Sequence, residues 1–348
     1  MPSIREILDI MARSSEASRI TDYHRRHVSD WTCPQCGGSN SPSATECVSC
    51  VPPSEQSSIV GQALEWLERI KAHQLTVVGE DIIDEYIHVR PAGKSAKDNL
   101  VTFVADGHNR WAGGARIINE HLRALGCEST LCTSSQAITK TRYIDTPFNQ
   151  KVFSFCNRDE ISFDFHLMPH QSKHLLIADF GHSSGNLPGS ARFTSLMVQS
   201  NSLNWGFNLL TKYERADYIV CDEAELRLAC QSRHGDIGNL TKHLAQRMGA
   251  KLIVVTLGHQ GAAMWDSAEY SPELIHLPTY ARKVVDRMGA GDAFLAASAP
   301  LAALGAPGHI VGLVGSVAAG LHVEKEGNPP LCREELIQRI KEIDVPQI

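Results

Sequence analysis

The stretch DRMGAGDAF at residues 286–294 decides how this sequence is interpreted, and a long apolar run follows it. Its glycines, Gly289 and Gly291, flank Ala290 and let the backbone turn tightly and approach a ligand closely. A helix that begins here points free N–H groups and the positive end of its dipole outward, where an anion fits. A carboxylate in the first turn, Asp292, can take a proton from an attacking hydroxyl. The alternative is an ordinary turn in which Asp292 only stabilises its own helix, and the tetrapeptide alone favours neither interpretation.

Apolar runs upstream of this stretch alternate with helical patterns, which indicates a doubly wound α/β sheet. The runs at 174–181, 216–223 and 251–258 end in polar residues or glycine, as buried parallel strands do, and a similar run begins at residue 75. Ligands of such sheets bind beyond the carboxyl ends of the strands. We therefore expect the functional site along that edge.

Apolar residues at helical spacing predict one helix from Ile59 and another from Gly114 to Leu125, which Gly126 ends. The most apolar stretch, 293–323, is interrupted by prolines and glycines, so it predicts two buried helices rather than a membrane span. The N-terminus carries charges and has no uninterrupted apolar segment, so we expect no signal peptide. A soluble cytoplasmic protein with reduced thiols is the corresponding expectation.

Length and composition narrow the class of protein further. The chain has 348 residues, of which 43% are hydrophobic and 21% charged, and its formal net charge is −6. This length predicts one large domain with additional segments, or two domains. The balance of 33 basic and 39 acidic residues excludes a broadly basic surface, so a nucleic-acid partner is not expected.

The segment Gly289-Ala-Gly-Asp292 resembles the C-terminal signature of the ribokinase/PfkB carbohydrate kinase family. Further segments resemble family motifs in the same order: Val77 to Asp84, Gly113-Gly-Ala115, Asp222-Glu-Ala-Glu225, Thr256-Leu-Gly-His-Gln-Gly261 and Ala318-Ala-Gly320. The resemblance covers about residues 75–345. It implies a ribokinase-like three-layer α/β/α sandwich with a small β lid, and an enzyme that uses ATP and Mg²⁺.

The resemblance also implies roles for individual residues. The catalytic set is the base Asp292 with the backbone of Gly289, Ala290 and Gly291. The nucleotide and magnesium set is Asp222, Glu225, Thr256, Gly258, Gly261, Ser316 and Ala319. The set facing the acceptor substrate is Asp84, Gly113, Gly114, Asn119, Lys140, Arg142 and Asp179.

Within this family the sequence is most similar to the bacterial heptose-7-phosphate kinases, in residues 138–142 and in the strand that ends at Asp179. Lys140 and Arg142 are two positions apart, so on a strand both face one way and suit a substrate that already carries a phosphate. A solvated strand face is the alternative. The resemblance implies phosphorylation of a heptose 7-phosphate at the anomeric hydroxyl, with another sugar or a nucleoside as alternatives.

The sequence departs from the family pattern at several positions. Met288 replaces a threonine, and Asp222 replaces an asparagine. The asparagine expected shortly after the glycine pair is absent, and Asn119 lies two positions beyond its place. Ser316 stands where an asparagine often borders the adenine. These departures leave the base and the anion site in place. They motivate a second hypothesis, in which the fold is a non-catalytic sensor or scaffold.

Four cysteines near the N-terminus form two Cys-x-x-Cys pairs ten residues apart, Cys33 with Cys36 and Cys47 with Cys50. In a reduced compartment this spacing favours a tetrahedral structural zinc site over an incidental cluster of thiols. The segment resembles Ran-binding zinc fingers and prokaryotic zinc ribbons. We expect the ribbon to dock on the kinase body or on a protein partner.

The expected organisation has four parts. A helical segment at 1–30 precedes the zinc ribbon at 31–54, a linker helix at 55–74, and the kinase domain at 75–345. Lid segments are expected at about 86–112 and 139–165. Lids of this family often pair between subunits, so the resemblance implies a homodimer.

Overall fold

The computed structural model describes residues 58–134, 136–158, 161, 172–183, 187, 191–268 and 274–343, and the backbone of 31–32 and 39–40. The short strands β1 (Trp31–Thr32) and β2 (Ser39–Asn40) pair antiparallel. The four predicted zinc ligands and the predicted helical segment at 1–30 lie outside the described residues.

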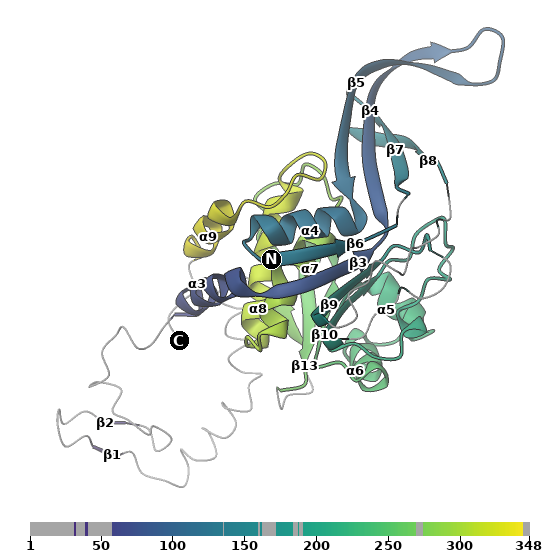
Figure 1. Ribbon diagram of the computed structural model, residues 1–348. Coiled ribbons are helices and arrows are strands. Elements are labelled where there is room, and N and C mark those ends of the chain that lie inside the picture. The colour runs from purple at the N-terminus through teal and green to yellow at the C-terminus, as the bar shows by residue number, and fades with distance from the viewer. Residues whose placement is uncertain are drawn as a thin grey trace.

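In the described part of the chain, eight strands form the central sheet (Figure 1). Their spatial order is β14 (Ile275–Leu277), β13 (Ala262–Asp266), β12 (Leu252–Thr256), β11 (Tyr218–Asp222), β10 (Ala191–Val198), β9 (Ser172–Asp179), β3 (Gln74–Gly79) and β6 (Glu128–Cys132). All neighbouring pairs are parallel except those of β13, which runs antiparallel to β12 and β14. The parallel strands therefore bring their carboxyl ends to one edge, as the alternation of apolar runs predicts.

Helices cover both faces of this sheet, so the three-layer sandwich expected from the sequence is confirmed (Figure 1). One face packs against α3 (Ile59–Arg69), α4 (Gly114–Ala124), α7 (Ala290–Ala303), α8 (Gly308–Val323) and α9 (Arg333–Lys341). The other face packs against α5 (Glu223–Ala229) and α6 (Ile237–Met248). Short 3₁₀ helices are η1 (Ile70–Ala72), η3 (Leu210–Lys212) and η4 (Gly258–Gln260).

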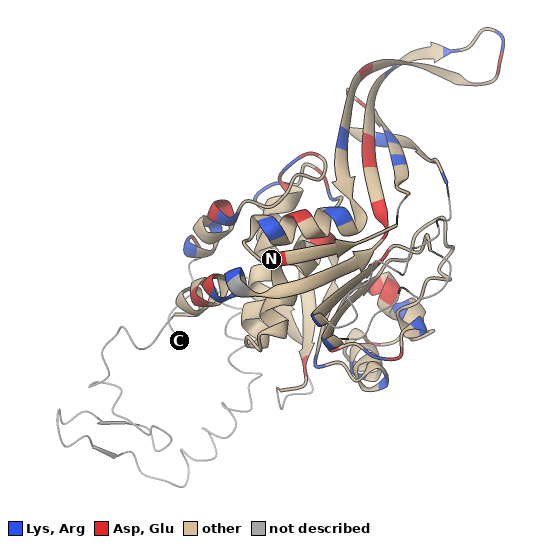
Figure 2. Cartoon of the chain, in the orientation of Figure 1, with Lys and Arg blue, Asp and Glu red and all other residues tan. Residues whose placement is uncertain are grey.

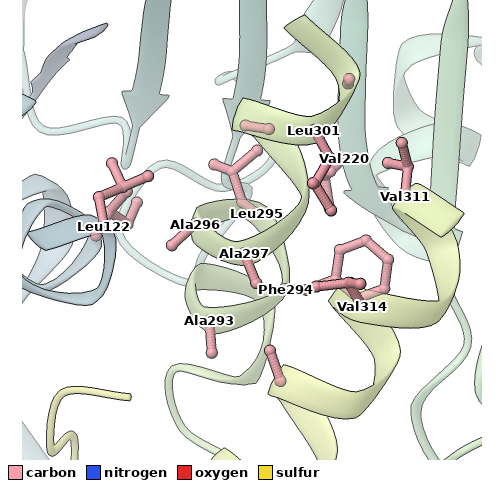
Figure 3. Close-up of a cluster of buried hydrophobic side chains, with 14 of the residues drawn as sticks. Leu122, Val220, Ala293, Phe294, Leu295, Ala296, Ala297, Leu301, Val311 and Val314 are labelled. Carbon is pink, nitrogen blue, oxygen red and sulfur yellow. The ribbon is translucent and has the colours of Figure 1, made fainter. Parts of the chain in front are cut away.

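Helices α7 and α8 account for the long apolar stretch, because both are buried on nearly all sides. Figure 3 shows α7 in the core, with Leu122 of α4 on one side and Val311 and Val314 of α8 on the other. A Cβ atom on Gly315 would lie 2.7 Å from the ring of Phe294, so the two helices pack closely at a glycine. No helix among the described residues is long and apolar enough to cross a membrane.

A second sheet projects from the sandwich (Figure 1). In the described part of the chain it has four strands, in the order β5 (Val101–Gly113), β4 (Asp81–Lys94), β7 (Ile138–Asp145) and β8 (Gln150–Cys156). We call it the lid sheet. Strand β4 pairs antiparallel with β5 and parallel with β7. The two predicted lid segments thus pair through β4 and β7, although part of 139–165 lies outside the described residues.

The lid sheet begins earlier than the sequence pattern suggested. Residues 77–84 resemble one strand closed by an acidic residue, but the central strand β3 ends at Gly79. The chain then enters β4, which places Asp84 in the lid sheet. Glu80 lies between the two strands, at this change of sheet. Its buried carboxylate accepts hydrogen bonds from the backbone N–H groups of Phe180 and His182.

Candidate active site

The anion site predicted at the start of α7 has the expected backbone geometry. Gly289 precedes the helix at φ 72°, a left-handed conformation that glycine adopts without strain. A Cβ atom there would lie 2.2 Å from Asn328 Oδ1 and 2.7 Å from His322 Nε2. A Cβ atom on Gly291 would meet nothing within 4 Å, so this side of the helix terminus is open. The free N–H groups of the first turn can therefore face an anion.

Asp292 lies in this first turn and is buried. The pKa of its carboxyl group is raised to about 8, first by burial and then by the neighbouring charges of Asp84 and Glu225, which Lys140 partly opposes. These side chains come from α7, β4, α5 and β7, so distant parts of the sequence converge on one carboxyl group. A carboxyl group with a raised pKa in a polar cleft suits proton transfer.

Three of the residues predicted to face the acceptor lie where β4 and β7 leave the sandwich: Asp84, Lys140 and Arg142. Asp84 is registered opposite Lys140, and Arg142 donates a hydrogen bond to the Asp84 carboxylate. In Figure 2, acidic bands on β4 lie beside basic bands on β7. Lys140 and Arg142 are therefore both half-buried next to Asp84. Burial lowers the pKa of Lys140, although Asp84 partly opposes this.

The glycine pair before α4 lies against the same acidic strand. A Cβ atom on Gly113 would lie 2.3 Å from Asp84 Oδ2. Gly114 has φ 58°, and a Cβ atom there would lie 2.4 Å from the carbonyl oxygen of Glu80. Any larger residue would displace β4 from α4, so the glycines set the position of Asp84.

Two residues predicted to face the acceptor have other surroundings. Asp179 is fully buried at the end of β9, where it accepts hydrogen bonds from Tyr213 Oη at 2.5 Å and Asn208 Nδ2 at 2.9 Å. Lys212 Nζ lies 2.5 Å from Asp179 Oδ2, the oxygen that Tyr213 also contacts. Asn119 is buried inside α4, five residues beyond Gly114. These contacts give Asp179 hydrogen-bonding partners within the fold.

The predicted magnesium residues form a capping box at the start of α5. Asp222 accepts a hydrogen bond from the Glu225 N–H at 2.7 Å, and Glu225 accepts one from the Asp222 N–H at 2.8 Å. Burial and then the charge of Asp222 raise the pKa of Glu225 to about 7. The exposed side chain of Asp222 supplies carboxylate oxygen, the donor that Mg²⁺ prefers. Among the described residues, no group of three or more His, Cys, Asp or Glu could hold a metal ion.

A pocket of about 240 Å³ lies between η4, α7 and α8, where the sequence predicts the nucleotide. Seven of the predicted residues line it: Thr256, Gly258, Gly261, Ser316, Ala319, Ala290 and Gly291. The pocket thus ends at the anion site, as phosphoryl transfer requires. Sequence reasoning did not assign a role to Arg287, which also lines this pocket and lies beside the glycines of the motif. A larger hollow of about 770 Å³ lies at the amino edge of the sheet and contains none of these residues.

A sequence model described as pfkB family carbohydrate kinase matches residues 197–332. The bifunctional protein HldE of Nitrosococcus oceani is 24% identical over 320 residues, which cover 79% of this chain and 65% of that protein. Ribokinase of Mus musculus is 34% identical over 90 residues, which cover 25% of this chain and 27% of that protein. The chain therefore spans less than two thirds of the length of these relatives.

Solved structures show the same fold. Ribokinase from Thermotoga maritima is 17% identical, with a TM-score of 0.58 over 78% of this chain and 100% of that chain. A nucleoside kinase from Methanocaldococcus jannaschii, described as an archaeal member of the ribokinase family, is 17% identical, with a TM-score of 0.56 over 78% and 98% of the two chains. The ribokinase-like fold implied by the sequence motifs is therefore confirmed, and the relatives support a kinase enzyme.

Proposed function

Because the chain has the ribokinase-like fold and residues 197–332 match the pfkB carbohydrate kinases, we propose that it is an ATP-dependent carbohydrate kinase. One observation carries the proposal. Asp292 lies between the nucleotide pocket, which ends at Ala290 and Gly291, and the charged groups Asp84 and Lys140. A base at this position faces a phosphoryl donor on one side and an acceptor on the other.

In the proposed reaction, Asp292 takes the proton of the acceptor hydroxyl, whose oxygen attacks the γ-phosphorus of ATP. The new O–P bond forms as the bond to the ADP oxygen breaks, and the N–H groups of Ala290, Gly291 and Asp292 stabilise the negative charge of the transferred group. Asp222 and Glu225 would help to hold Mg²⁺, which neutralises phosphate charge when bound. Asp84 and the backbone at Gly114 orient the acceptor.

We propose that the acceptor is a phosphorylated sugar, with a heptose 7-phosphate phosphorylated at the anomeric hydroxyl as the best candidate. Lys140 supports this proposal, because a half-buried cation beside Asp84 suits a ligand that brings its own negative charge. Similarity to the HldE protein over 79% of this chain supports the same class. Another sugar and a nucleoside remain the alternative acceptors, the second because a nucleoside kinase shares the fold.

The second candidate function is a sensor or scaffold without turnover, which the aspartate at position 222 favours, since it adds negative charge beside the phosphate site. Binding and turnover separate the two functions. We expect ATP with Mg²⁺ to raise the unfolding midpoint, because both bind the folded state. We then expect phosphate transfer to one member of a panel of sugars, sugar phosphates and nucleosides. Nucleotide binding without transfer to any acceptor would favour the sensor, and no nucleotide binding would contradict the kinase.

The proposed homodimer would form through the lid sheet. Strand β8 is an edge strand, and its side chains Phe153 and Phe155 are 59% and 54% exposed. An unpaired edge with exposed aromatic rings is a favourable surface for pairing with a second copy. We also propose a structural zinc ribbon near the N-terminus and a cytoplasmic location. The cysteines of the ribbon lie outside the described residues.

We expect the purified chain to have a molar mass near twice 38.2 kDa in light scattering. The double variant F153S/F155S removes both exposed rings and should reduce this mass to that of one chain. The matched control is W205S, which removes a ring that is 84% exposed but lies outside the lid sheet. A wild-type chain that stays at one-chain mass, or a double variant that stays dimeric, would contradict the lid interface.

A further inference from the structure

A buried carboxylate at Asp286 connects the lid sheet to the turn that carries the anion site. Asp286 lies six residues before Asp292 and is 8% exposed. Its carboxylate accepts hydrogen bonds from described residues of three regions: Tyr86 Oη at 2.5 Å, Lys151 Nζ at 3.0 Å, Met288 N at 3.2 Å and Gly327 N at 3.3 Å. We call residues 286–292 the anion-site turn. The side chains of Tyr86 and Lys151 therefore hold this turn from outside.

Both side-chain donors belong to the lid sheet. Tyr86 is on β4 and Lys151 is on β8, with β7 between the two strands. Lys151 Nζ lies 5.4 Å from the centre of the Tyr86 ring, and the edge of Trp111 on β5 packs against the same ring at a centroid distance of 4.8 Å. Two strands of the lid sheet thus reach one carboxylate outside it, and a third strand packs against the tyrosine that does so. A displacement of the lid sheet would break this contact.

The same strand face carries the acceptor contact. Asp84 and Tyr86 are two positions apart on β4, so both side chains point to one side of the strand. Strand β7 places Lys140 opposite Asp84 and Arg142 opposite Tyr86. A ligand that fixes Asp84 therefore also fixes Tyr86, at a separation of about 7 Å along the strand.

The turn is further held by the last turn of α8 and by the segment that follows it. His322 Nε2 lies 3.0 Å from the carbonyl oxygen of Met288. Asn328 Nδ2 donates a hydrogen bond to the carbonyl oxygen of Ala112 on β5, at 3.0 Å. A Cβ atom on Gly327 would lie 2.3 Å from the Trp111 ring, so this segment fits closely between the lid sheet and the turn. The turn and the lid sheet are therefore in contact at two places.

The charge distribution favours an ionised carboxylate at this point. Burial opposes ionisation of Asp286, but the hydrogen bonds from Tyr86 and Lys151 outweigh it and lower the pKa of the carboxyl group. Lys151 is 43% exposed, so its ammonium can leave the carboxylate without being transferred from water into the core. When the lid sheet opens, the ammonium returns to water and the Asp286 carboxylate keeps the hydrogen bonds from the N–H groups of Met288 and Gly327.

We propose that Asp286 is a positioning residue, and that Lys151 and Tyr86 couple closure of the lid sheet to the geometry of the anion-site turn. The consequence for catalysis rests on the proposed phosphoryl transfer. When an acceptor binds at Asp84 and holds the lid sheet closed, Asp286 keeps the N–H groups of Ala290 and Gly291 aimed at the transferred group. When the lid sheet opens, the turn loses two of its donors and the anion site loosens.

The test compares K151M, which removes the ammonium and keeps most of the aliphatic chain, with K151R, which restores a cation. The matched control is K94M, which removes an exposed lysine at the end of β4. Amide hydrogen exchange is measured on peptides that span 286–292, with and without ATP and Mg²⁺. We expect about ten times faster exchange in K151M and wild-type exchange in K151R and K94M. This measurement needs no turnover, so it tests the contact even if the chain proves not to be a kinase.

If the chain is a kinase, K151M should lower kcat about ten- to a hundredfold with KM for ATP changed by less than about threefold. K151R should restore most of the rate. Y86F, which removes the phenolic hydroxyl but keeps the ring, should reproduce the exchange and rate changes in weaker form. Wild-type exchange of 286–292 in both K151M and Y86F would overturn the proposal. So would faster exchange with unchanged kcat, because the contact would then not position the anion site.

Discussion

Replacing Asp292 with asparagine is expected to lower kcat by about 10²- to 10⁴-fold, which is the range that a general base contributes. The amide keeps the size and burial of the side chain but cannot accept the proton of the acceptor hydroxyl. The nucleotide pocket is lined by other residues, so the affinity for ATP should stay within about threefold of the wild type. Turnover is measured on the purified variant with the acceptor found in the panel.

The same substitution should have the opposite effect on stability, and this effect depends on pH. A carboxyl group whose pKa is raised from 3.8 to about 8 stabilises the folded state while it is protonated. This contribution is complete below the unfolded pKa and is lost progressively as the pH rises to about 8, because the unfolded chain ionises first. Asparagine does not ionise. D292N and the wild type should therefore unfold at similar temperatures near pH 4, whereas D292N should unfold at a higher temperature at pH 9.

The matched control for both measurements is D98N, which changes an exposed aspartate in the loop between β4 and β5 of the lid sheet. It should match the wild type in rate and in unfolding temperature at either pH. Retained turnover in D292N would remove the proposed base. Equal unfolding temperatures of D292N and the wild type at pH 9 would show that Asp292 is not held in the buried, acid-rich surroundings described above.

Local sequence signals predicted the parts of the site that depend on neighbouring residues. The glycine at 289 precedes a helix in a left-handed turn, and Asp222 and Glu225 form a capping box three residues apart, so both features are readable from short stretches. The nucleotide pocket was also predictable, because Thr256, Gly258 and Gly261 lie within six residues.

The parts that were not predicted depend on partners that are distant in the sequence. Asp179 ends a strand and so looks available for a ligand. In the fold its carboxylate already accepts hydrogen bonds from Asn208 and Tyr213, which lie 29 and 34 residues later. Asp286 is held by Tyr86, 200 residues earlier. A sequence pattern reports which side chains end a strand or begin a helix. It does not report which tertiary donor reaches a buried carboxylate.

Replacing Lys140 with methionine is the second change for which we expect a large effect, because it acts on both the base and the acceptor. Lys140 lowers the pKa of Asp292, whereas Asp84 and Glu225 raise it. Without the ammonium, three carboxyl groups would share the cleft with less compensation, and Asp292 would hold its proton to higher pH. The acidic limb of kcat/KM, which reports the free enzyme, should therefore move to higher pH.

The acceptor provides a second, independent readout of the same variant. If Lys140 contacts the phosphate of the acceptor, K140M should raise KM for the phosphorylated sugar at least about tenfold, which corresponds to the loss of about 1.4 kcal/mol of binding. KM for the same sugar without its phosphate should change far less. The shift of the acidic limb should appear with both acceptors, because it originates in the charge beside Asp292.

The conservative variant K140R separates charge from shape at this position. It keeps a cation between Asp84 and Asp292, so the acidic limb should stay near that of the wild type even if the longer side chain impairs binding of the acceptor. A limb that moves equally in K140R and K140M would mean that the side chain acts by packing. An unchanged limb in K140M would remove Lys140 from the electrostatics of the base, whereas an unchanged preference for phosphorylated acceptors would remove it from substrate recognition.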